Sequence, residues 1–564
     1  MKLVECVPNF SEGRDRNIIK QITDAIEAVE DVSLLDVDPG QETNRTVVTF
    51  VGSPEAVAEA AFQAVKKAYE VIDMRNHTGA HPRMGATDVC PFVPVAEVSM
   101  EDCIEISKKV GKRVGEELQI PVYLYENSAS SPERQNLAYV RKGEYEGLEE
   151  KLKDPEYKPD FGPTEFNAKA GALITGAREF LIAYNINLNT KDVKKAKDLA
   201  LIIREKGRRK RDENYQPVCD KNGNIIQIPG LFTNVKGIGW YIPEYGQAQI
   251  SINFTNYKIS PPHIVFDKVR ELALERGLVV TGSELVGLIP LEAMLMAGKY
   301  FLQNQGVSYA VSEKKLVHIA TISLGLSDIV PFDPNEKIIE YRIAKKGLLV
   351  DKTISDFVDE LASDSPAPGG GSVAALCGSL AAGLTSMVGN LTVGKRKFNT
   401  SEERIAYKEN EKVMMEMAFK AQQLKKKLLN AIDEDTEAFN KYMSAMKLPK
   451  KTNEEKEIRK YAIQKAIINA TKVPLETMKL CYEVIKLSQK AGEKGNPNAV
   501  SDAGVSAISA LAGAKGAFLN VKINLPSIED EQVKKEILFE AEEILKDSKI
   551  LSEKVEKLVL EKMK

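Results

Sequence analysis

The pattern of hydrophobic and polar positions changes near residue 350. Before this point, short segments alternate between apolar and polar residues, as half-buried strands do, and helix-length segments separate them. After it, apolar residues recur at helical spacing over long stretches, which predicts a bundle of helices. The expected helices cover residues 353–361, 372–391, 402–447, 453–491, 502–519 and 529–562.

The first part of the chain predicts mixed sheets with helices. Strands are expected at residues 3–8, 33–37, 46–51 and 88–95, and helices at 17–29 and 54–69. This βαββαβ order is that of a ferredoxin-like unit. A second unit is expected from strands at 236–241 and 248–254 and helices at 193–203, 263–276 and 291–301. The predicted fold class is two α/β (α+β, ferredoxin-like) subdomains followed by an all-α helix bundle.

Length and composition limit the possible classes of protein. A chain of 564 residues is too long for a single hydrophobic core. Its 43% hydrophobic and 28% charged residues are typical of soluble globular proteins. The formal net charge of -3 gives no general attraction to nucleic acid, so we expect no nucleic-acid partner.

Cysteine usage and the N-terminal sequence favour a cytoplasmic protein. The six cysteines are scattered without motif spacing, and MKLVECVPNF lacks the long apolar core of a signal peptide. Residues 365–394 carry no charge and are long enough to span a bilayer. Their many Gly, Ala, Ser, Thr and Asn residues are more typical of a helix buried in a bundle, so we expect no membrane association.

One loop concentrates candidate chemistry. Residues 75–94 read RNHTGAHPRMGATDVCPFVP and hold His77 and His81, two of only four histidines in the chain. Histidine titrates near neutrality, which favours proton transfer, although a solvated or capping histidine is the alternative. A metal site is a further alternative, but no Cys-x-x-Cys, His-Glu-x-x-His or nearby carboxylate cluster supports it, so we expect no metal.

Three further segments can supply polar groups near this loop. Asp36 and Asp38 share one face of an expected strand, and either can orient a histidine; an Asp-rich hairpin turn is the alternative. In NFSEG, Ser11 is expected to cap a helix whose N-terminus can also hold a substrate carboxylate. The third segment covers residues 160–171, with the sequence DFGPTEFNAKAG. It either binds a flat heteroaromatic ring through backbone hydrogen-bond donors or simply connects two domains.

Two other segments are unusual in composition. Residues 204–211, REKGRRKR, predict a solvated turn, with electrostatic guidance of an acidic substrate as the alternative. Residues 212–229 follow and contain DKNGN, a candidate hairpin turn. Residues 368–372, PGGGS, can form an anion-binding helix N-terminus, but the Gly-Lys-Ser/Thr of a P-loop does not follow them.

Several motifs together resemble glutamate formimidoyltransferase. They are VECVPNFSEG, LLDVDPG with TNRTV, HTGAHPRMGATDVCPFVPV, and DFGPTEFNAKAGA with TGAREFLIAYNINL. VKGIGWYIPE and TGSELVGLIPLEAM extend the resemblance to about residue 343, with residues 212–229 as an insertion. The resemblance implies a catalytic His81, a partner aspartate Asp38 and a structural role for His77. It also implies a folate-binding loop of Gly162, Pro163, Thr164, Glu165, Phe166, Asn167, Ala168, Lys169, Ala170 and Gly171.

The remaining chain resembles formimidoyltetrahydrofolate cyclodeaminase. The motifs are SPAPGGGSVAAL, VGKRKF, DEDTEAFNKYMSAMKLPK, NAVSD and FLNVKINL. The resemblance assigns the active-site carboxylate to Asp435, whereas Asp433 lies on a different helical face. Lys395, Arg396 and Lys397 form a basic cluster. The cluster can bind folate carboxylates, or it can simply lie at the end of a helix. The implied domains are transferase subdomains at 1–178 and 179–343, a linker at 344–350 and a cyclodeaminase domain at 351–564.

The two resemblances imply a bifunctional folate enzyme of histidine degradation. It transfers the formimidoyl group of N-formimidoyl-L-glutamate to N5 of tetrahydrofolate, with or without a polyglutamate tail. It then closes 5-formimidoyltetrahydrofolate to 5,10-methenyltetrahydrofolate and releases ammonia. Tetrahydrofolate is the expected co-substrate, and a homo-oligomer is the expected assembly. The alternatives are an active transferase fused to a bundle that only assembles the oligomer, and a folate-binding scaffold without turnover.

Overall fold

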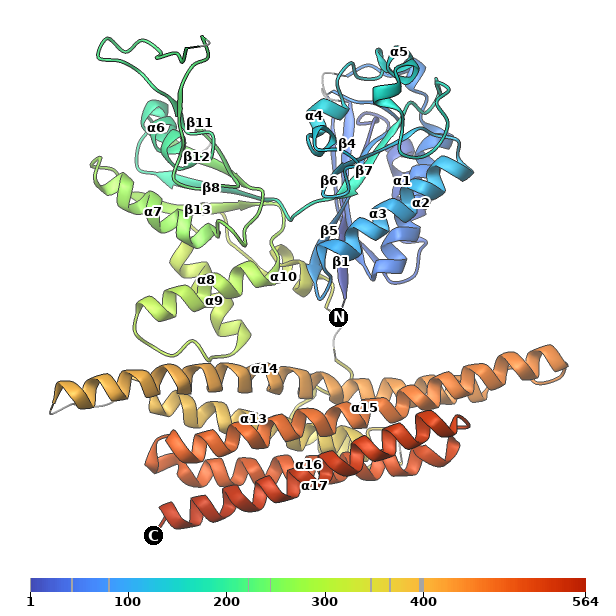
Figure 1. The fold of residues 1–564 in the computed structure, drawn as a ribbon, viewed down its shortest axis with the longest axis vertical. Coiled ribbons are helices and arrows are strands. Elements are labelled where there is room, and N and C mark those ends of the chain that lie inside the picture. Colours follow the sequence, from blue (N-terminus) through green and yellow to red (C-terminus); the bar gives the residue numbers. More distant parts are fainter. Residues whose placement is uncertain are drawn as a thin grey trace. The chain divides into compact units, whose positions relative to one another are not determined.

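The computed structural model describes residues 2–41, 44–79, 82–221, 223–243, 245–344, 347–364, 367–394 and 400–564. The chain forms two compact units. One comprises residues 1–293 and 324–343, and the other comprises residues 294–323 and 344–564. The first unit is built from sheets and helices and the second is helical, as predicted (Figure 1).

A seven-stranded sheet organises the N-terminal part of the first unit. Its strands are β1 Leu3–Cys6, β2 Asn9–Phe10, β3 Val32–Gly40, β4 Arg45–Gly52, β5 Thr87–Ala96, β6 Val122–Glu126 and β7 Leu173–Ala177. The antiparallel order β3-β4-β1-β5 is ferredoxin-like, and β2 also lies between β4 and β5. The ferredoxin-like prediction is therefore confirmed. Beyond β5, the parallel strands β7 and β6 extend the sheet.

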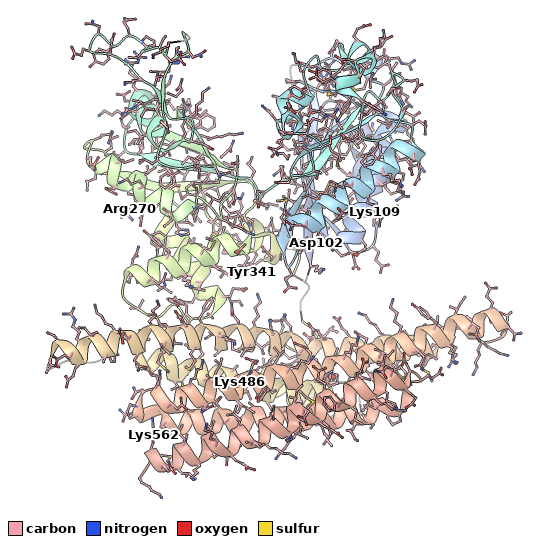
Figure 2. The ribbon with its side chains drawn as sticks, in the orientation of Figure 1. Asp102, Lys109, Arg270, Tyr341, Lys486 and Lys562 are labelled. Atoms are coloured by element: carbon pink, nitrogen blue, oxygen red, sulfur yellow. The ribbon has the colours of Figure 1, made fainter. Side chains whose placement is uncertain are left out.

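One face of this sheet is covered by helices α1 Arg16–Glu27, α2 Pro54–Val71 and α3 Met100–Glu117 (Figure 1). Ile22 and Val57 from these helices belong to the same buried cluster as Phe50 of β4. Helix α3 begins with a capping box, in which Ser99 and Asp102 each bond the other's backbone amide (Figure 2). The helix-covered face is therefore the hydrophobic core of this subdomain.

The opposite face of the sheet is partly covered by the short helices α4 Leu137–Val140 and α5 Leu148–Lys153. There Val89 and Tyr123 from the strands pack with Leu148. This face also carries the polar residues of the candidate transferase site, because alternate strand residues point to opposite faces.

The second part of the first unit is a four-stranded antiparallel sheet in the order β11-β12-β8-β13. Its strands are β8 Ile182–Leu188, β11 Val235–Ile242, β12 Gln247–Phe254 and β13 Val280–Val286. Helices α6 Val193–Ile203 and α7 Pro262–Leu274 pack against it (Figure 1). The short helices α10 Pro334–Lys337 and α11 Ile339–Arg342 follow later in the chain.

Residues 208–228 form an arm on this second sheet. Strand β9 Arg208–Arg209 pairs with β10 Gln227–Ile228, so the basic segment contributes to a strand pair and is not only a solvated turn. The DKNGN turn is confirmed, because Asp220 Oδ1 accepts a hydrogen bond from Asn224 N at 2.8 Å. The carbonyl oxygen of Asp220 also accepts from Gly223 N at 3.1 Å.

The bundle consists of six helices within the described residues from 347 onward. They are α12 Ile354–Leu361, α13 Gly370–Thr392, α14 Ser401–Met446, α15 Asn453–Lys494, α16 Val500–Asn524 and α17 Glu531–Lys562. The predicted helices are confirmed, with boundaries shifted by a few residues. Small residues allow close packing, since a Cβ atom on Gly378 or Gly513 would lie 2.7 or 2.9 Å from Cys481 Sγ. Lys562, near the end of α17, donates to the Gly492 carbonyl at 2.8 Å (Figure 2).

Two segments of the bundle have the length and apolar composition of a membrane-crossing helix, namely Gly370–Thr392 and Pro497–Ser527. Their most apolar stretches are 61% and 44% buried within the fold. The first coincides with the uncharged segment seen in the sequence. Its buried small residues pack against neighbouring helices, as in the core of a bundle.

The hairpin of α8 Leu291–Asn304 and α9 Glu313–Leu324 packs on the bundle. Asn390 of α13 accepts a hydrogen bond from Ser308 Oγ at 2.6 Å and donates Nδ2 to the Ala310 carbonyl at 2.8 Å. One bundle side chain therefore fixes the loop between the two hairpin helices.

Candidate functional sites

His77 and Arg83 hold the described part of the histidine loop. His77 Nε2 lies 2.8 Å from the carbonyl oxygen of Asn44, and its Nδ1 accepts from Arg83 Nε at 3.2 Å. The ring is therefore the Nε2–H tautomer. Burial lowers the pKa of His77 and outweighs the hydrogen bond to Asn44, so the ring is neutral at pH 7. Arg83 is itself fixed by two hydrogen bonds to Glu146, at 2.7 and 2.8 Å. These contacts give His77 a structural role.

Asn44 holds the N-terminal flank of the histidine loop, at Thr78, by a hydrogen bond. Its Nδ2 donates to the Thr78 carbonyl at 2.9 Å, while its Oδ1 accepts from Gly13 N at 3.0 Å. Asn44 has a φ angle of 47°, a left-handed conformation that asparagine adopts more readily than most residues. One residue at the start of β4 thus connects three segments.

The second flank lies against the predicted folate-binding loop. Ala86 N donates to the Ala170 carbonyl at 2.8 Å, and Ala172 N donates to the Met84 carbonyl at 3.0 Å. Gly171 must be a glycine here, because its φ is 69° and a Cβ atom would lie 2.1 Å from the Met84 oxygen. The sequence motifs around residues 81 and 162–171 are therefore direct neighbours in the fold.

His81 and Ala80 lie outside the described residues. On either side of them, Thr78 is hydrogen-bonded to Asn44, and Met84 is hydrogen-bonded to Ala172, directly after the folate-binding loop. The predicted catalytic role of His81 stays a prediction.

The loop of residues 162–171 is organised by Asn167. Its Oδ1 accepts from Ala170 N at 3.0 Å, and its carbonyl accepts from Gly171 N at 2.7 Å. The loop continues into β7 of the same sheet, so the interpretation as a connection between domains is wrong. Asp160, just before the loop, is structural, since its Oδ2 accepts from Leu124 N at 2.8 Å.

Asp36 and Asp38 share one face of β3, as predicted. Asp36 pairs with Thr49 and Asp38 with Val47, two residues apart on β4. The chain continues as a strand through Gly40, which pairs with Arg45, so Asp36 and Asp38 lie on a strand and the alternative of an Asp-rich hairpin turn is wrong. Asp38 is exposed and available to a ligand or a neighbouring side chain.

An ion pair that was not predicted from the sequence lies next to the histidine loop. Asp88 is 1% exposed, and its Oδ1 accepts from Met84 N at 3.0 Å. Its carboxylate pairs with Arg141, which donates Nε to Oδ1 at 3.3 Å and Nη2 to Oδ2. A buried carboxylate requires such a partner. The available signal was a lone aspartate at the start of the apolar segment VCPFVPV.

Ser11 does not cap a helix, contrary to the prediction. Helix α1 is capped by Asp15, which accepts from the amides of Asn17 and Ile18. Ser11 instead donates Oγ to the Gly85 carbonyl at 2.7 Å, and its amide donates to the Ala86 carbonyl at 2.9 Å. The NFSEG motif therefore supports the histidine loop.

In the bundle, Asp435 of α14 lies at the N-terminus of α13. Its Oδ2 accepts from Ser372 N at 3.1 Å, and a Cβ atom on Gly371 would lie 2.1 Å from its Oδ1. The N-cap residue Gly369 has no side chain, so Asp435 supplies the cap from another helix. The anion at the predicted anion-binding N-terminus is therefore the carboxylate of Asp435.

Burial raises the pKa of Asp435 above its ordinary value of 3.8, although the hydrogen bonds from Ser372 oppose the shift. A raised pKa brings a carboxyl group closer to the range in which it can both give and accept a proton. Asp433 lies on a different face, as predicted, since its Oδ1 accepts from Leu349 N at 2.7 Å and so fastens the linker. The basic cluster of Lys395, Arg396 and Lys397 lies outside the described residues.

Among the described residues, no group of three or more His, Cys, Asp or Glu side chains is placed to hold a metal ion.

Family models match three parts of the chain. The N-terminal subdomain of the formiminotransferase domain matches residues 3–178, the formiminotransferase domain residues 183–344, and the formiminotransferase-cyclodeaminase model residues 353–543. A formimidoyltransferase-cyclodeaminase of Dictyostelium discoideum is 43% identical over 559 residues, which cover 98% of both chains. The chain belongs to the formimidoyltransferase-cyclodeaminase family. It contains both parts that the family name states.

Single-function relatives match each part separately. A glutamate formimidoyltransferase of Thermoplasma acidophilum is 43% identical over 325 residues, covering 57% of this chain and all of the relative. A methenyltetrahydrofolate cyclohydrolase of Methylorubrum extorquens is 42% identical over 212 residues, covering 38% of this chain and 98% of the relative. Proteins similar to each of the two parts of this chain thus also occur separately.

Proposed function

We propose that the first unit transfers the formimidoyl group of N-formimidoyl-L-glutamate to N5 of tetrahydrofolate. The observation that carries this proposal is the pair of fastenings around His81. One flank is bonded to Asn44, and the other to the predicted folate-binding loop through Met84 and Ala86. The described flanks of the segment therefore contact Asn44, directly before the strand that pairs with the strand of Asp38, and the loop expected to bind the folate.

In this mechanism His81 acts as base and then as acid. It accepts the N5 proton as N5 attacks the amidine carbon, and it then protonates the glutamate nitrogen that leaves. Asp38 orients the imidazole and stabilises its protonated form. The folate lies on Gly162–Gly171, where backbone amides can bond its ring.

The test is glutamate release by the full chain with both substrates, compared with His81→Ala. We expect the variant to lose at least about 100-fold in kcat, the usual contribution of a general acid or base. Tetrahydrofolate binding, measured by calorimetry, is expected to persist. Equal turnover by the two proteins would remove His81 from the mechanism.

The bundle closes the product to 5,10-methenyltetrahydrofolate. N10 attacks the formimidoyl carbon, and the amino nitrogen leaves as ammonia after it takes a proton. Asp435 accepts the N10 proton and delivers it to this nitrogen, as its raised pKa allows. Neither step needs a metal.

A second activity for the bundle is favoured by the 42% identity to a methenyltetrahydrofolate cyclohydrolase. In that reaction water adds to the methenyl carbon, the bond to N5 breaks, and 10-formyltetrahydrofolate and a proton are formed. The test is decay of methenyl absorbance after addition of 5,10-methenyltetrahydrofolate. Faster decay with wild type than with Asp435→Asn supports this activity, and equal decay excludes it.

We place this activity in the cytoplasm, in histidine degradation, and in a homo-oligomer whose folates can carry polyglutamate tails. Exposed apolar residues on α16 support self-association, namely Val505, Ile508, Leu519 and Ile523. Light scattering after size exclusion tests the assembly, and a monomer would contradict it. Arg208 and Arg209 on the arm are candidates for the polyglutamate tail, which a comparison of KM for mono- and polyglutamates tests.

A further inference from the structure

Tyr145 connects the two loops of the proposed transferase site. It lies between helices α4 and α5, and its backbone amide donates to the Arg83 carbonyl at 2.9 Å. Its hydroxyl donates to the Ala168 carbonyl at 2.6 Å. Arg83 is two residues after His81 in the histidine loop, and Ala168 is in the predicted folate-binding loop. One residue therefore bonds both the loop of the expected base and the loop expected to bind the folate.

The end of this connection at the histidine loop is firmly held. Glu146, the residue after Tyr145, accepts two hydrogen bonds from the Arg83 guanidinium. Glu144, the residue before Tyr145, has a carboxylate oxygen 3.6 Å from Arg83 Nη1. The Arg83 side chain is only 9% exposed. Both the backbone and the side chain of Arg83 thus bond residues 144–146, which fixes Tyr145 relative to the histidine loop.

The other end of the connection contacts the middle of the folate-binding loop. Besides the hydroxyl bond to Ala168, the ring of Tyr145 packs against Phe166, with ring centroids 5.6 Å apart and planes tilted by 47°. Such a tilted pair is a favourable aromatic contact. Burial raises the pKa of Tyr145, so its hydroxyl stays protonated at neutral pH and acts as the donor to Ala168.

This connection is separate from the backbone contact between the same loops. The backbone contact is an antiparallel bridge between Gly85 and Gly171. A second link at another point of both loops restricts rotation about that bridge. Ala168 is half-buried, so water could also bond its carbonyl, and the fold does not need the hydroxyl to satisfy it. The hydroxyl of Tyr145 therefore affects the position of the loop more than the stability of the fold.

We propose that Tyr145 is a positioning residue of the formimidoyl transfer, whose hydroxyl holds the folate-binding loop at the distance from the histidine loop that the reaction requires. The inference rests on the proposed transferase function. In that reaction the base must lie within hydrogen-bond distance, about 3 Å, of the proton that it removes from N5. A misplacement of about 1 Å at such a site can lower the rate about 100-fold. The hydroxyl acts through Ala168 and does not itself touch the reacting atoms.

The experiment compares wild type with Tyr145→Phe, which removes only the hydroxyl and keeps both the ring and the backbone amide. Glutamate release by the full chain is measured while each substrate is varied in turn. We expect the KM for tetrahydrofolate to rise and its kcat/KM to fall about 3- to 10-fold, as for the loss of one neutral hydrogen bond. The KM for N-formimidoyl-L-glutamate is expected to stay the same, because the amide bond to Arg83 is retained.

Hydrogen–deuterium exchange provides a readout that does not depend on turnover. The amides of Ala170 and Gly171 bond Asn167 within the folate-binding loop. We expect these amides to exchange faster in Tyr145→Phe, because the loop opens more easily without the hydroxyl. Exchange in helix α3 is expected to be unchanged.

Tyr139→Phe is the matched control. Tyr139 is also half-buried, and its hydroxyl donates to Glu156 Oε1 at 2.8 Å. Glu156 belongs to neither loop, so this variant loses the same chemical group without changing the link between them. It is expected to change neither KM nor the exchange of residues 162–171.

Three results would overturn the proposal. An unchanged KM for tetrahydrofolate with unchanged exchange in Tyr145→Phe would show that the hydroxyl does not hold the loop. An equal rise of both KM values would show damage to the whole site. Unfolding of Tyr145→Phe at a much lower urea concentration than Tyr139→Phe would show that the hydroxyl serves the fold. A wild type that releases no glutamate from formimidoylglutamate would instead refute the underlying transferase function.

Discussion

His77 has a set of fixed contacts in the fold. Both ring nitrogens of His77 are engaged, by Asn44 and by Arg83. A ring bonded on both sides and kept neutral by burial is poorly placed to exchange protons with a substrate. At the residue scale, this geometry supports the structural role expected for His77.

The burial of His263 predicts that the free energy of unfolding depends on pH. It is buried on α7, and burial lowers its pKa from 6.5 to about 4. Below pH 6.5 the unfolded chain binds a proton that the folded chain resists, so stability falls as the pH decreases from 6.5 towards 4. The full contribution is up to about 3 kcal/mol, from 1.36 kcal/mol for each pKa unit.

The measurement uses Trp240, the only tryptophan, which lies in the same subdomain. Urea unfolding is followed by its fluorescence between pH 7 and 4 in wild type and His263→Gln. We expect the variant to lose less stability over this range, and the exposed His318→Gln to behave like wild type. An identical loss in His263→Gln and wild type would contradict the assignment.

Residue contacts are predictable from the sequence where a local motif determines them, and not where the partner is distant along the chain. The different faces of Asp433 and Asp435 follow from helical periodicity alone. The pairing of Asp88 with Arg141 joins residues 53 positions apart, and no local pattern indicates it. The capping role given to Ser11 was wrong because Asp15 lies directly before the helix and takes that role.

At the scale of elements, the start of α13 depends on Gly371. A Cβ atom there would lie 2.1–2.5 Å from the carboxylate of Asp435, so Gly371→Ala must displace that side chain. We expect cyclodeaminase kcat to fall at least about tenfold because the acid is misplaced, while glutamate release is unchanged. The two reactions are measured in the same sample.

Gly383→Ala on the same helix is the control. Nothing lies within 4 Å of a Cβ atom at Gly383, so the variant is expected to keep both activities. It should gain stability of up to about 1 kcal/mol from helix propensity. Equal losses in both variants would show that the helix as a whole, and not Asp435, is responsible.

Helix α15 contains Pro474, which cannot donate to the carbonyl of Ala470. Asn524 of α16 replaces that bond by donating Nδ2 to Ala470 at 2.9 Å. We expect Asn524→Leu to destabilise the bundle by about 1 kcal/mol, because a partly buried carbonyl loses its partner. In a Pro474→Ala background the loss should be smaller, since residue 474 can then donate. A double-mutant cycle by urea unfolding tests this, and strict additivity would contradict the compensation.

Long helices were easier to predict than short buried strands. Amphipathic periodicity sustained over many turns marks α14 and α15, and both were found. Strand β7 was missed because all five of its residues are buried, so it shows no alternation of apolar and polar positions. For the same reason, the role of residues 162–171 in leading back into the first sheet was not visible.

At the scale of the whole molecule, the compact units do not follow the family boundaries. Residues 294–323 belong to the matched formiminotransferase domain but fold with the bundle. There Tyr309 packs edge-on against Phe419, with ring centroids 5.5 Å apart. A contact between residues so distant along the chain cannot be read from local periodicity, whereas the division into α/β and helical parts can.

The central claim is that one chain carries two enzymes and that Asp435 serves the second. The most direct measurement is a time course of methenyltetrahydrofolate absorbance and ammonia release with formimidoylglutamate and tetrahydrofolate. Asparagine can still accept the Ser372 hydrogen bond, so Asp435→Asn should fold normally. We expect wild type to form both products and the variant to release glutamate while it accumulates formimidoyltetrahydrofolate. Enzyme-dependent ammonia release by the variant at the wild-type rate would contradict the role of Asp435. Glutamate release by wild type without ammonia would leave the bundle as a structural partner of the transferase.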